Sequence, residues 1–196
     1  MPRYASRSWR SYDPGAAVSP QVVLAPVSSP RRILGLDPGS LRTGYGIIDC
    51  LPRGESHVAS GCLRATGASL AVRLRYIHEQ LLAVIAQYQP EEVAVESVFM
   101  HRNVDSALKL GQARGAALCA AVAQGAAVYE YAPRAIKLAV VGTGAAGKAQ
   151  VSHMVQVLLG ISAPATADIS DALAIALCHA QNRRTASRIA ALGTTG

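Results

Sequence analysis

The sequence predicts an α/β domain built on a mixed five-stranded sheet, with three antiparallel strands followed by parallel strands and with helices on its faces. Three apolar runs separated only by short turns come first, which is typical of an antiparallel meander. Strand and helix patterns then alternate, which favours parallel pairing through right-handed crossovers. The 196 residues are 51% hydrophobic and 16% charged, which suits one globular domain.

The antiparallel strands are expected at residues 33–36, 44–50 and 58–63. Apolar residues then recur at helical spacing from Leu70 to Tyr88, with Ser69 placed to cap this helix and Pro90 placed to stop it. Two further strands are expected at residues 92–96 and 127–131, and further helices at about 105–123, 133–140, 149–159 and 168–181. A crossover after the meander places the strand at 92–96 beside the first strand.

The chain is expected to divide into three parts. Residues 1–30 hold five prolines and six serines without regular patterning, which predicts a disordered leader. An organelle transit peptide, or a translation start assigned too far upstream, would also explain this composition. Residues 31–182 form the folded domain, and residues 183–196 are expected to be a basic, flexible tail.

Charge and cysteine content narrow the class of protein. The formal net charge of +7 makes nucleic acid or another polyanion the natural partner. Cys50, Cys62, Cys119 and Cys178 show no CxxC spacing and have apolar neighbours, so we expect reduced, buried thiols in a cytosolic protein. The apolar runs are too short to span a membrane.

Four of the twelve acidic residues lie where an acid is unexpected. Asp37 ends the first strand, and Glu96 ends the strand at 92–96. Asp168 and Asp171 lie three residues apart, so they share one face at the start of the last helix. Turn chemistry in Asp-Pro-Gly would explain Asp37, and helix capping would explain Asp168, but neither explanation covers all four acids.

The expected strand order brings Asp37 and Glu96 to the same end of the sheet. Converged carboxylates repel one another and are costly to bury without cations. Oxygen ligands of this kind suit Mg²⁺ or Mn²⁺ rather than zinc. Two such ions about 4 Å apart can catalyse phosphodiester hydrolysis. The acids in a basic chain therefore predict a metal-dependent nuclease.

The segment from Gly142 to Ala149 is close to the phosphate-binding pattern GxxxxGK[ST]. Ala149 replaces the hydroxyl residue that would hold Mg²⁺, and a helix rather than a strand is expected before the loop. We therefore expect no nucleotide site here, and favour a glycine-rich loop that presents Lys148 to a DNA phosphate.

Four segments of the sequence together resemble the RuvC family of Holliday junction resolvases. They read ILGLDPGSLRTGYGII, VAVESVFMHRNVDSALKLGQARG, YEYAPRAIKLAVVGTGAAGKAQVSHMV and ADISDALAIALCHA, and they occur in the family's order. The likeness covers residues 33–181, nearly the whole expected domain, and excludes the leader. It implies a ribonuclease H-like fold and a structure-specific endodeoxyribonuclease that acts in DNA recombination and repair.

The resemblance assigns roles to individual residues. The catalytic acids and metal ligands of the family fall on Asp37, Glu96, Asp168 and Asp171, which are the four acids already singled out. Lys137 and Lys148 fall where the family places lysines near the scissile DNA, although the residues alone favour ordinary surface lysines. Phe99 falls where an aromatic side chain helps to unstack the junction centre; packing in the core is its alternative role.

The resemblance also implies cofactors and partners. It implies Mg²⁺, with two ions per active site and Mn²⁺ as a substitute, and symmetric paired nicks that leave 5′-phosphate and 3′-hydroxyl ends on a four-way junction. It implies a homodimer, for which the helix carrying Gly111 and Gly115 matches the dimer helix of the family. A branch-migration helicase complex of the RuvA and RuvB type and a bacterial cytoplasmic location complete these expectations.

Three other functions are alternatives to a junction-resolving nuclease. An actin-like or sugar-kinase-like ATPase would need a second domain, for which this chain has no room. A non-catalytic junction- or RNA-binding module would have no use for four converged acids. A nuclease of the same fold that acts on RNA or on other branched DNA remains the nearest alternative.

Overall fold

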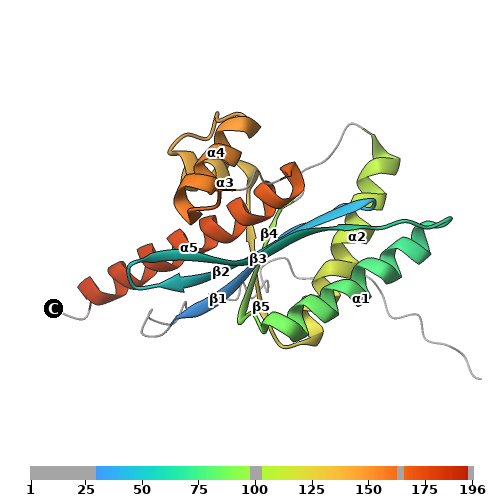
Figure 1. Ribbon diagram of the computed structural model, residues 1–196, viewed down its shortest axis with the longest axis horizontal. Helices are drawn as coiled ribbons and strands as arrows, with labels where there is room; N and C mark the ends of the chain where they lie inside the picture. The colour runs from blue at the N-terminus through green and yellow to red at the C-terminus, as the bar shows by residue number, and fades with distance from the viewer. Residues whose placement is uncertain (1–29, 98–102, 163–165, 194–196) are drawn as a thin grey trace, which may run out of the picture.

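The computed structural model describes residues 30–97, 103–162 and 166–193. A five-stranded sheet in the order β3-β2-β1-β4-β5 forms its centre (Figure 1). The strands are β1 (Arg31–Asp37), β2 (Arg42–Leu51), β3 (Gly54–Arg64), β4 (Glu92–Glu96) and β5 (Ala127–Tyr131). The first three pair antiparallel, whereas β1–β4 and β4–β5 pair parallel, so the predicted mixed topology is confirmed.

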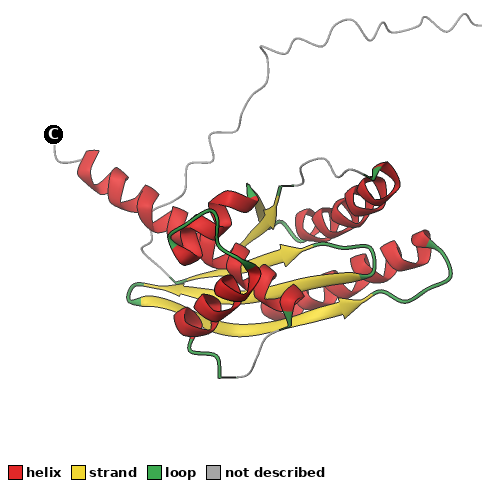
Figure 2. Cartoon of the chain, turned by 90° about the horizontal axis from the view of Figure 1, so that it is seen from above, coloured by secondary structure: helices red, strands yellow, loops and turns green. Residues whose placement is uncertain are grey.

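Helices cover both faces of this sheet. On one face lie α1 (Leu70–Tyr88) and α2 (Val104–Ala123), and on the other lie α3 (Pro133–Val141), α4 (Lys148–Leu159) and α5 (Ala167–Gly193) (Figures 1 and 2). The period of two along β1 directs Leu34 and Leu36 into the cluster under α1 and α2, and Ile33 into the cluster under α5. Asp37 therefore ends β1 on the face covered by α5.

Helix α1 begins after Ser69 and ends before Pro90, as the sequence predicts. The Ser69 side chain accepts a hydrogen bond from the backbone N–H of Val72, which satisfies one free donor of the first turn. The helix ends at Tyr88, and Gln89 adopts a left-handed conformation with φ of 50° directly before Pro90.

Glycines on the neighbouring strands β1 and β2 let α5 lie close to the backbone of the sheet. A β-carbon on Gly35 of β1 would overlap the carbonyl oxygen of Ala172 and lie 2.8 Å from the amide nitrogen of Ala176. Its cross-strand partner on β2, Gly46, is in similar contact with Leu173. Since neither strand places a side chain under the helix at these two residues, the start of α5 lies close to β1 and β2.

The last part of the chain differs from the expectation. The basic tail expected from residue 183 is instead a continuation of α5, which ends at Gly193. Arg183 is only 1% exposed and pairs with Glu92 of β4. In the sequence Arg183 reads as a solvated residue of a basic segment, because its buried partner lies on a distant strand.

Other expectations concern the remaining segments. The expected leader, residues 1–30, lies outside the described residues apart from Pro30. None of the helices that the structure describes is long and apolar enough to cross a membrane.

All four cysteines are free, as predicted; Cys50 and Cys178 are buried, but Cys119 is exposed on α2.

Candidate active site

The four predicted acids come from three elements that meet at one end of the sheet. Asp37 ends β1 and Glu96 ends β4, and these two strands are parallel neighbours. Asp168 and Asp171 lie in the first two turns of α5. The backbone of Asp168 contacts Gly44, which is the cross-strand partner of Asp37. Strand order and the close seat of α5 therefore bring together acids that are far apart in the sequence.

Asp37 has a strongly raised pKa. Burial, followed by the charges of Asp171, Glu96 and Asp168, raises the pKa of Asp37 from 3.8 to about 7, against the opposing effect of Lys148. Burial and the charge of Asp171 also raise the pKa of Glu96. Burial and the neighbouring acids therefore both oppose ionisation of Asp37 and Glu96.

Cationic side chains contact the two acids of α5. The Lys148 ammonium lies 3.0 Å from Asp171 Oδ2, and the Arg42 guanidinium lies 3.8 Å from Asp168 Oδ2. The Cys62 thiol lies 3.5 Å from the same oxygen of Asp168. Hydrogen bonding to Asp171, and the charges of the acids, outweigh desolvation and raise the pKa of Lys148.

The donor chemistry of the cluster fits hard divalent cations. All four acids offer carboxylate oxygens, which Mg²⁺ and Mn²⁺ prefer. Burial, together with the charges of the other acids, raises the pKa of Asp37, and bound cations would oppose both effects. Among the described residues, no three His, Cys, Asp or Glu side chains converge on one point at ligand distance. Asp168 and Asp171 are turned instead toward Arg42 and Lys148.

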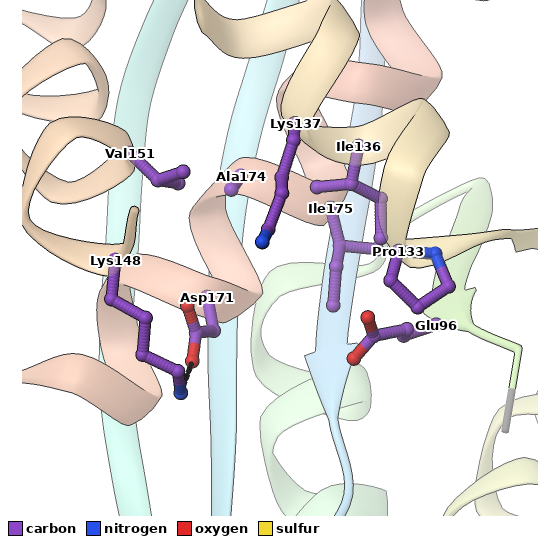
Figure 3. Close-up of a pocket in the computed structure, with 9 residues that line it drawn as sticks. All are labelled: Glu96, Pro133, Ile136, Lys137, Lys148, Val151, Asp171, Ala174 and Ile175. Atoms are coloured by element: carbon purple, nitrogen blue, oxygen red, sulfur yellow. Dashed lines mark hydrogen bonds and ion pairs between the residues drawn. The ribbon is translucent and has the colours of Figure 1, made fainter. Parts of the chain in front are cut away.

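A cavity of about 130 Å³ opens beside Glu96 and Asp171. Both predicted lysines line it, together with an apolar wall from α3, α4 and α5 (Figure 3). In Figure 3 the Lys137 side chain points into the space between Asp171 and Glu96. Lys148 lies on the other side of Asp171 from Glu96, and its ammonium donates a hydrogen bond to Asp171. The Lys148 side chain is 80% exposed, so it is both a surface lysine and a neighbour of the acids.

The glycine-rich loop before α4 has the predicted context. Helix α3, not a strand, precedes it, and Gly142 ends that helix with φ of 80°. Lys148 is the first residue of α4. Phe99, the remaining predicted site residue, lies outside the described residues.

Comparison with known proteins identifies the family. The family model "Crossover junction endodeoxyribonuclease RuvC" matches residues 33–179. A protein of that name from Methylococcus capsulatus is 55% identical over 158 residues, which cover 81% of this chain and 95% of the relative.

The chain belongs to the RuvC family. A RuvC relative from Marinobacter nauticus is also 55% identical, over 82% of this chain and 92% of its own length. The solved structure of Thermus thermophilus RuvC in complex with Holliday junction substrate superposes with a TM-score of 0.75 at 34% identity, covering 80% of this chain and 97% of that chain. Membership in the RuvC family confirms the predicted ribonuclease H-like fold and the predicted class of enzyme, an endodeoxyribonuclease.

Two residues that contact the acids, Arg42 and Cys62, were not predicted from the sequence. Arg42 and Cys62 both contact Asp168 but lie on β2 and β3, remote from it in the chain. Arg42 directly follows the DPGSL segment that begins with Asp37. This closeness in the sequence could have indicated that Arg42 lies near the acids. Cys62 had no signal, because it reads as an ordinary apolar position of the third strand.

Proposed function

We propose that this protein resolves Holliday junctions by Mg²⁺-dependent hydrolysis, making symmetric nicks in two opposite strands of a four-way DNA junction. The observation that carries the proposal is the gathering of Asp37, Glu96, Asp168 and Asp171 at one sheet end, beside a cavity lined by Lys137 and Lys148. The Thermus thermophilus relative was solved with Holliday junction substrate, which favours the same substrate for this chain.

The four acids would hold the metal ions. Two divalent cations, when bound, would activate a water for attack on phosphorus and stabilise the leaving 3′ oxygen. Mn²⁺ would substitute for Mg²⁺, since both take carboxylate ligands. Asp37 and Glu96 end the strands β1 and β4, whereas Asp168 and Asp171 lie in the first two turns of α5.

The lysines have a separate task in this proposal. Lys148 and Lys137 both lie close enough to Glu96 to influence its charge. A cation at this position would stabilise the negative charge that develops on the phosphate during in-line attack. The water oxygen would add to phosphorus, the bond to the 3′ oxygen would break, and that oxygen would take up a proton. The products would carry 5′-phosphate and 3′-hydroxyl ends.

Symmetric cutting requires two copies of the site. We propose a homodimer formed through α2, whose outer face carries Val104, Leu108, Gly111, Gly115 and Val122. Val104, Leu108 and Val122 are each more than 60% exposed, and open space surrounds Gly111 and Gly115. The buried face of α2 instead uses Ala113, Ala117, Ala120 and Ala121. The outer face is thus free for a second copy, and two-fold symmetry would set the two sites at a constant separation.

Family membership alone supports two further parts of the proposal. These are cooperation with a branch-migration helicase complex of the RuvA and RuvB type and a bacterial cytoplasmic location.

A panel of labelled substrates tests the function. Four-way junction, fork, linear duplex and RNA hybrid are incubated with Mg²⁺ and either the wild-type protein or the Asp37→Asn variant. We expect paired nicks only in the junction, and none with the variant, while junction binding by the variant survives. Preferred cutting of the RNA hybrid or the fork would support the related nuclease instead, and cutting by Asp37→Asn would exclude Asp37 from the reaction.

Phe99 requires its own experiment. We propose that its side chain unstacks bases at the junction centre. Phe99→Ala should then weaken cutting more than binding, and a fluorescent base analogue at the crossover should report less unstacking. Equal loss of cutting, binding and stability would indicate that Phe99 packs in the core.

A further inference from the structure

A second cluster of ionisable side chains is buried between α5 and the sheet. His179, Glu92 and Arg183 are 0%, 6% and 1% exposed. His179 Nε2 lies 2.8 Å from Glu92 Oε2, and Arg183 pairs with the other oxygen of Glu92. Tyr131 places its hydroxyl 2.6 Å from His179 Nδ1, and the Tyr129 ring stacks on the imidazole with centroids 4.3 Å apart. The proposed hydrolysis uses none of these groups.

Partners within the cluster meet both carboxylate oxygens of Glu92 and both ring nitrogens of His179. Burial opposes ionisation of Glu92, but hydrogen bonds and charges from His179 and Arg183 outweigh it and lower the pKa of Glu92. Both ring nitrogens of His179 have partners, because Nε2 faces Glu92 and Nδ1 faces the Tyr131 hydroxyl. Such a buried pair adds little net stability over apolar side chains, so its role must be sought in geometry.

The cluster connects the elements that carry the acids. Glu92 begins the strand that Glu96 ends, and Tyr131 is the cross-strand partner of Glu96. His179 lies about two turns further along α5 than Asp171. The hydrogen bonds therefore run from β4 and β5 to the helix that presents Asp168 and Asp171.

Apolar contacts and hydrogen bonds both hold α5 on the sheet. The glycines Gly35 and Gly46 set how closely α5 approaches β1 and β2, and its buried apolar side chains, among them Leu173, pack over the sheet without directional bonds. Hydrogen bonds are directional, and those of His179 and Arg183 reach β4, the strand of Glu96.

We infer that Glu92, His179, Arg183 and Tyr131 are positioning residues that set the axial position of α5 relative to β4, and thereby the separation of Asp171 and Glu96 across the metal site. This inference rests on the proposed function. Misplacement of reacting groups by about 1 Å can cost about 100-fold in rate, and partners that orient metal ligands typically affect metal affinity about 10–100-fold.

The main test replaces the buried charges with apolar side chains. In Glu92→Met/Arg183→Met, we expect Mn²⁺ affinity, measured by calorimetry without DNA, to fall about tenfold. Single-turnover junction cutting should fall at least as much, while junction binding in the absence of metal stays within about twofold of wild type. The single variant Arg183→Lys keeps the cation beside Glu92 and should bind Mn²⁺ with the affinity of the wild type.

A matched control removes an ion pair that does not reach α5. Arg32→Met/Asp49→Met breaks the pair between β1 and β2, whose atoms lie 2.8 Å apart, and should leave Mn²⁺ affinity unchanged. Tyr131→Phe retains the ring, removes only the hydroxyl that meets His179, and provides the same test if the double variant does not fold.

The outcomes are distinguishable. Folded variants that bind Mn²⁺ and cut junctions like wild type, even with a lower melting temperature, would overturn the inference and leave the cluster a structural element. Failure of the wild-type protein to cut junctions would overturn the proposed function instead.

Discussion

The backbone carbonyl of Asp168, at the start of α5, lies where a β-carbon on Gly44 of β2 would have to be. Gly44 is the cross-strand partner of Asp37. The absence of a side chain at residue 44 therefore lets two acids from opposite ends of the domain sequence reach one site.

Gly44→Ala should push the start of α5 away from the sheet. The added methyl group meets backbone rather than a flexible side chain, so we expect a loss of about 1–3 kcal/mol in the free energy of unfolding. Junction cutting should fall more than tenfold, because Asp168 and Asp171 move together. Denaturant unfolding and single-turnover cleavage measure the two effects. Gly67→Ala is the control: its new methyl group would lie 2.9 Å from the side chain of Val72, which is 43% exposed and can shift, so we expect a smaller loss of stability and unchanged cutting.

Asp37→Asn should stabilise the metal-free protein at high pH. The pKa of Asp37 is about 7 in the folded protein and 3.8 for the free side chain, so the folded state binds more protons between these values. The free energy of unfolding of the wild type therefore falls as pH rises from about 4 to about 7. Asn cannot ionise, so the variant should be more stable than wild type at pH 8, by about 1–3 kcal/mol, and no more stable below about pH 4.

Thermal unfolding across pH, without divalent ions, checks this expectation for Asp37. Added Mg²⁺ at pH 8 should raise the melting temperature of the wild type more than that of the variant, because ligation relieves the repulsion. Equal pH profiles for the two proteins would mean that Asp37 titrates normally.

Lys148→Met should separate catalysis from stability. The side chain is 80% exposed, so its loss should change the free energy of unfolding by less than about 1 kcal/mol. Its ammonium contacts Asp171 and lies near Asp37 and Glu96, so cutting should fall about 10–100-fold. Arg75→Met removes a similarly exposed cation of α1 and is the control. Single-turnover rates within twofold of wild type would show that Lys148 is an ordinary surface lysine.

Leu108→Glu should disrupt the proposed dimer. Leu108 is 62% exposed on the outer face of α2, and a charge there would have to be buried between two copies. We expect the mass from light scattering to shift to that of a monomer and paired nicking to be lost. Val157→Glu makes the same change at a 59% exposed residue of α4 and should leave the mass unchanged. A dimeric Leu108→Glu protein would place the interface elsewhere.

Local patterns determined most of the fold. Period-two apolar runs, the Ser69 cap, the Pro90 stop and the order of strands and helices each depend on neighbouring residues, and they predicted the mixed sheet correctly. Asp37 and Glu96 could be placed together from sequence because strand order alone makes them neighbours. Their position at the ends of apolar strands was sufficient to single them out.

Contacts between distant segments were decided only by the tertiary structure. Arg183 reads as a solvated residue until Glu92 is found beside it, and Arg42 and Cys62 gain their role only from the place where α5 begins. The raised pKa of Asp37 has the same origin, since burial and three other carboxylates produce it together. Periodicity reports which face of an element is apolar, whereas the partner of a buried charge depends on how whole elements pack, and no local pattern encodes that.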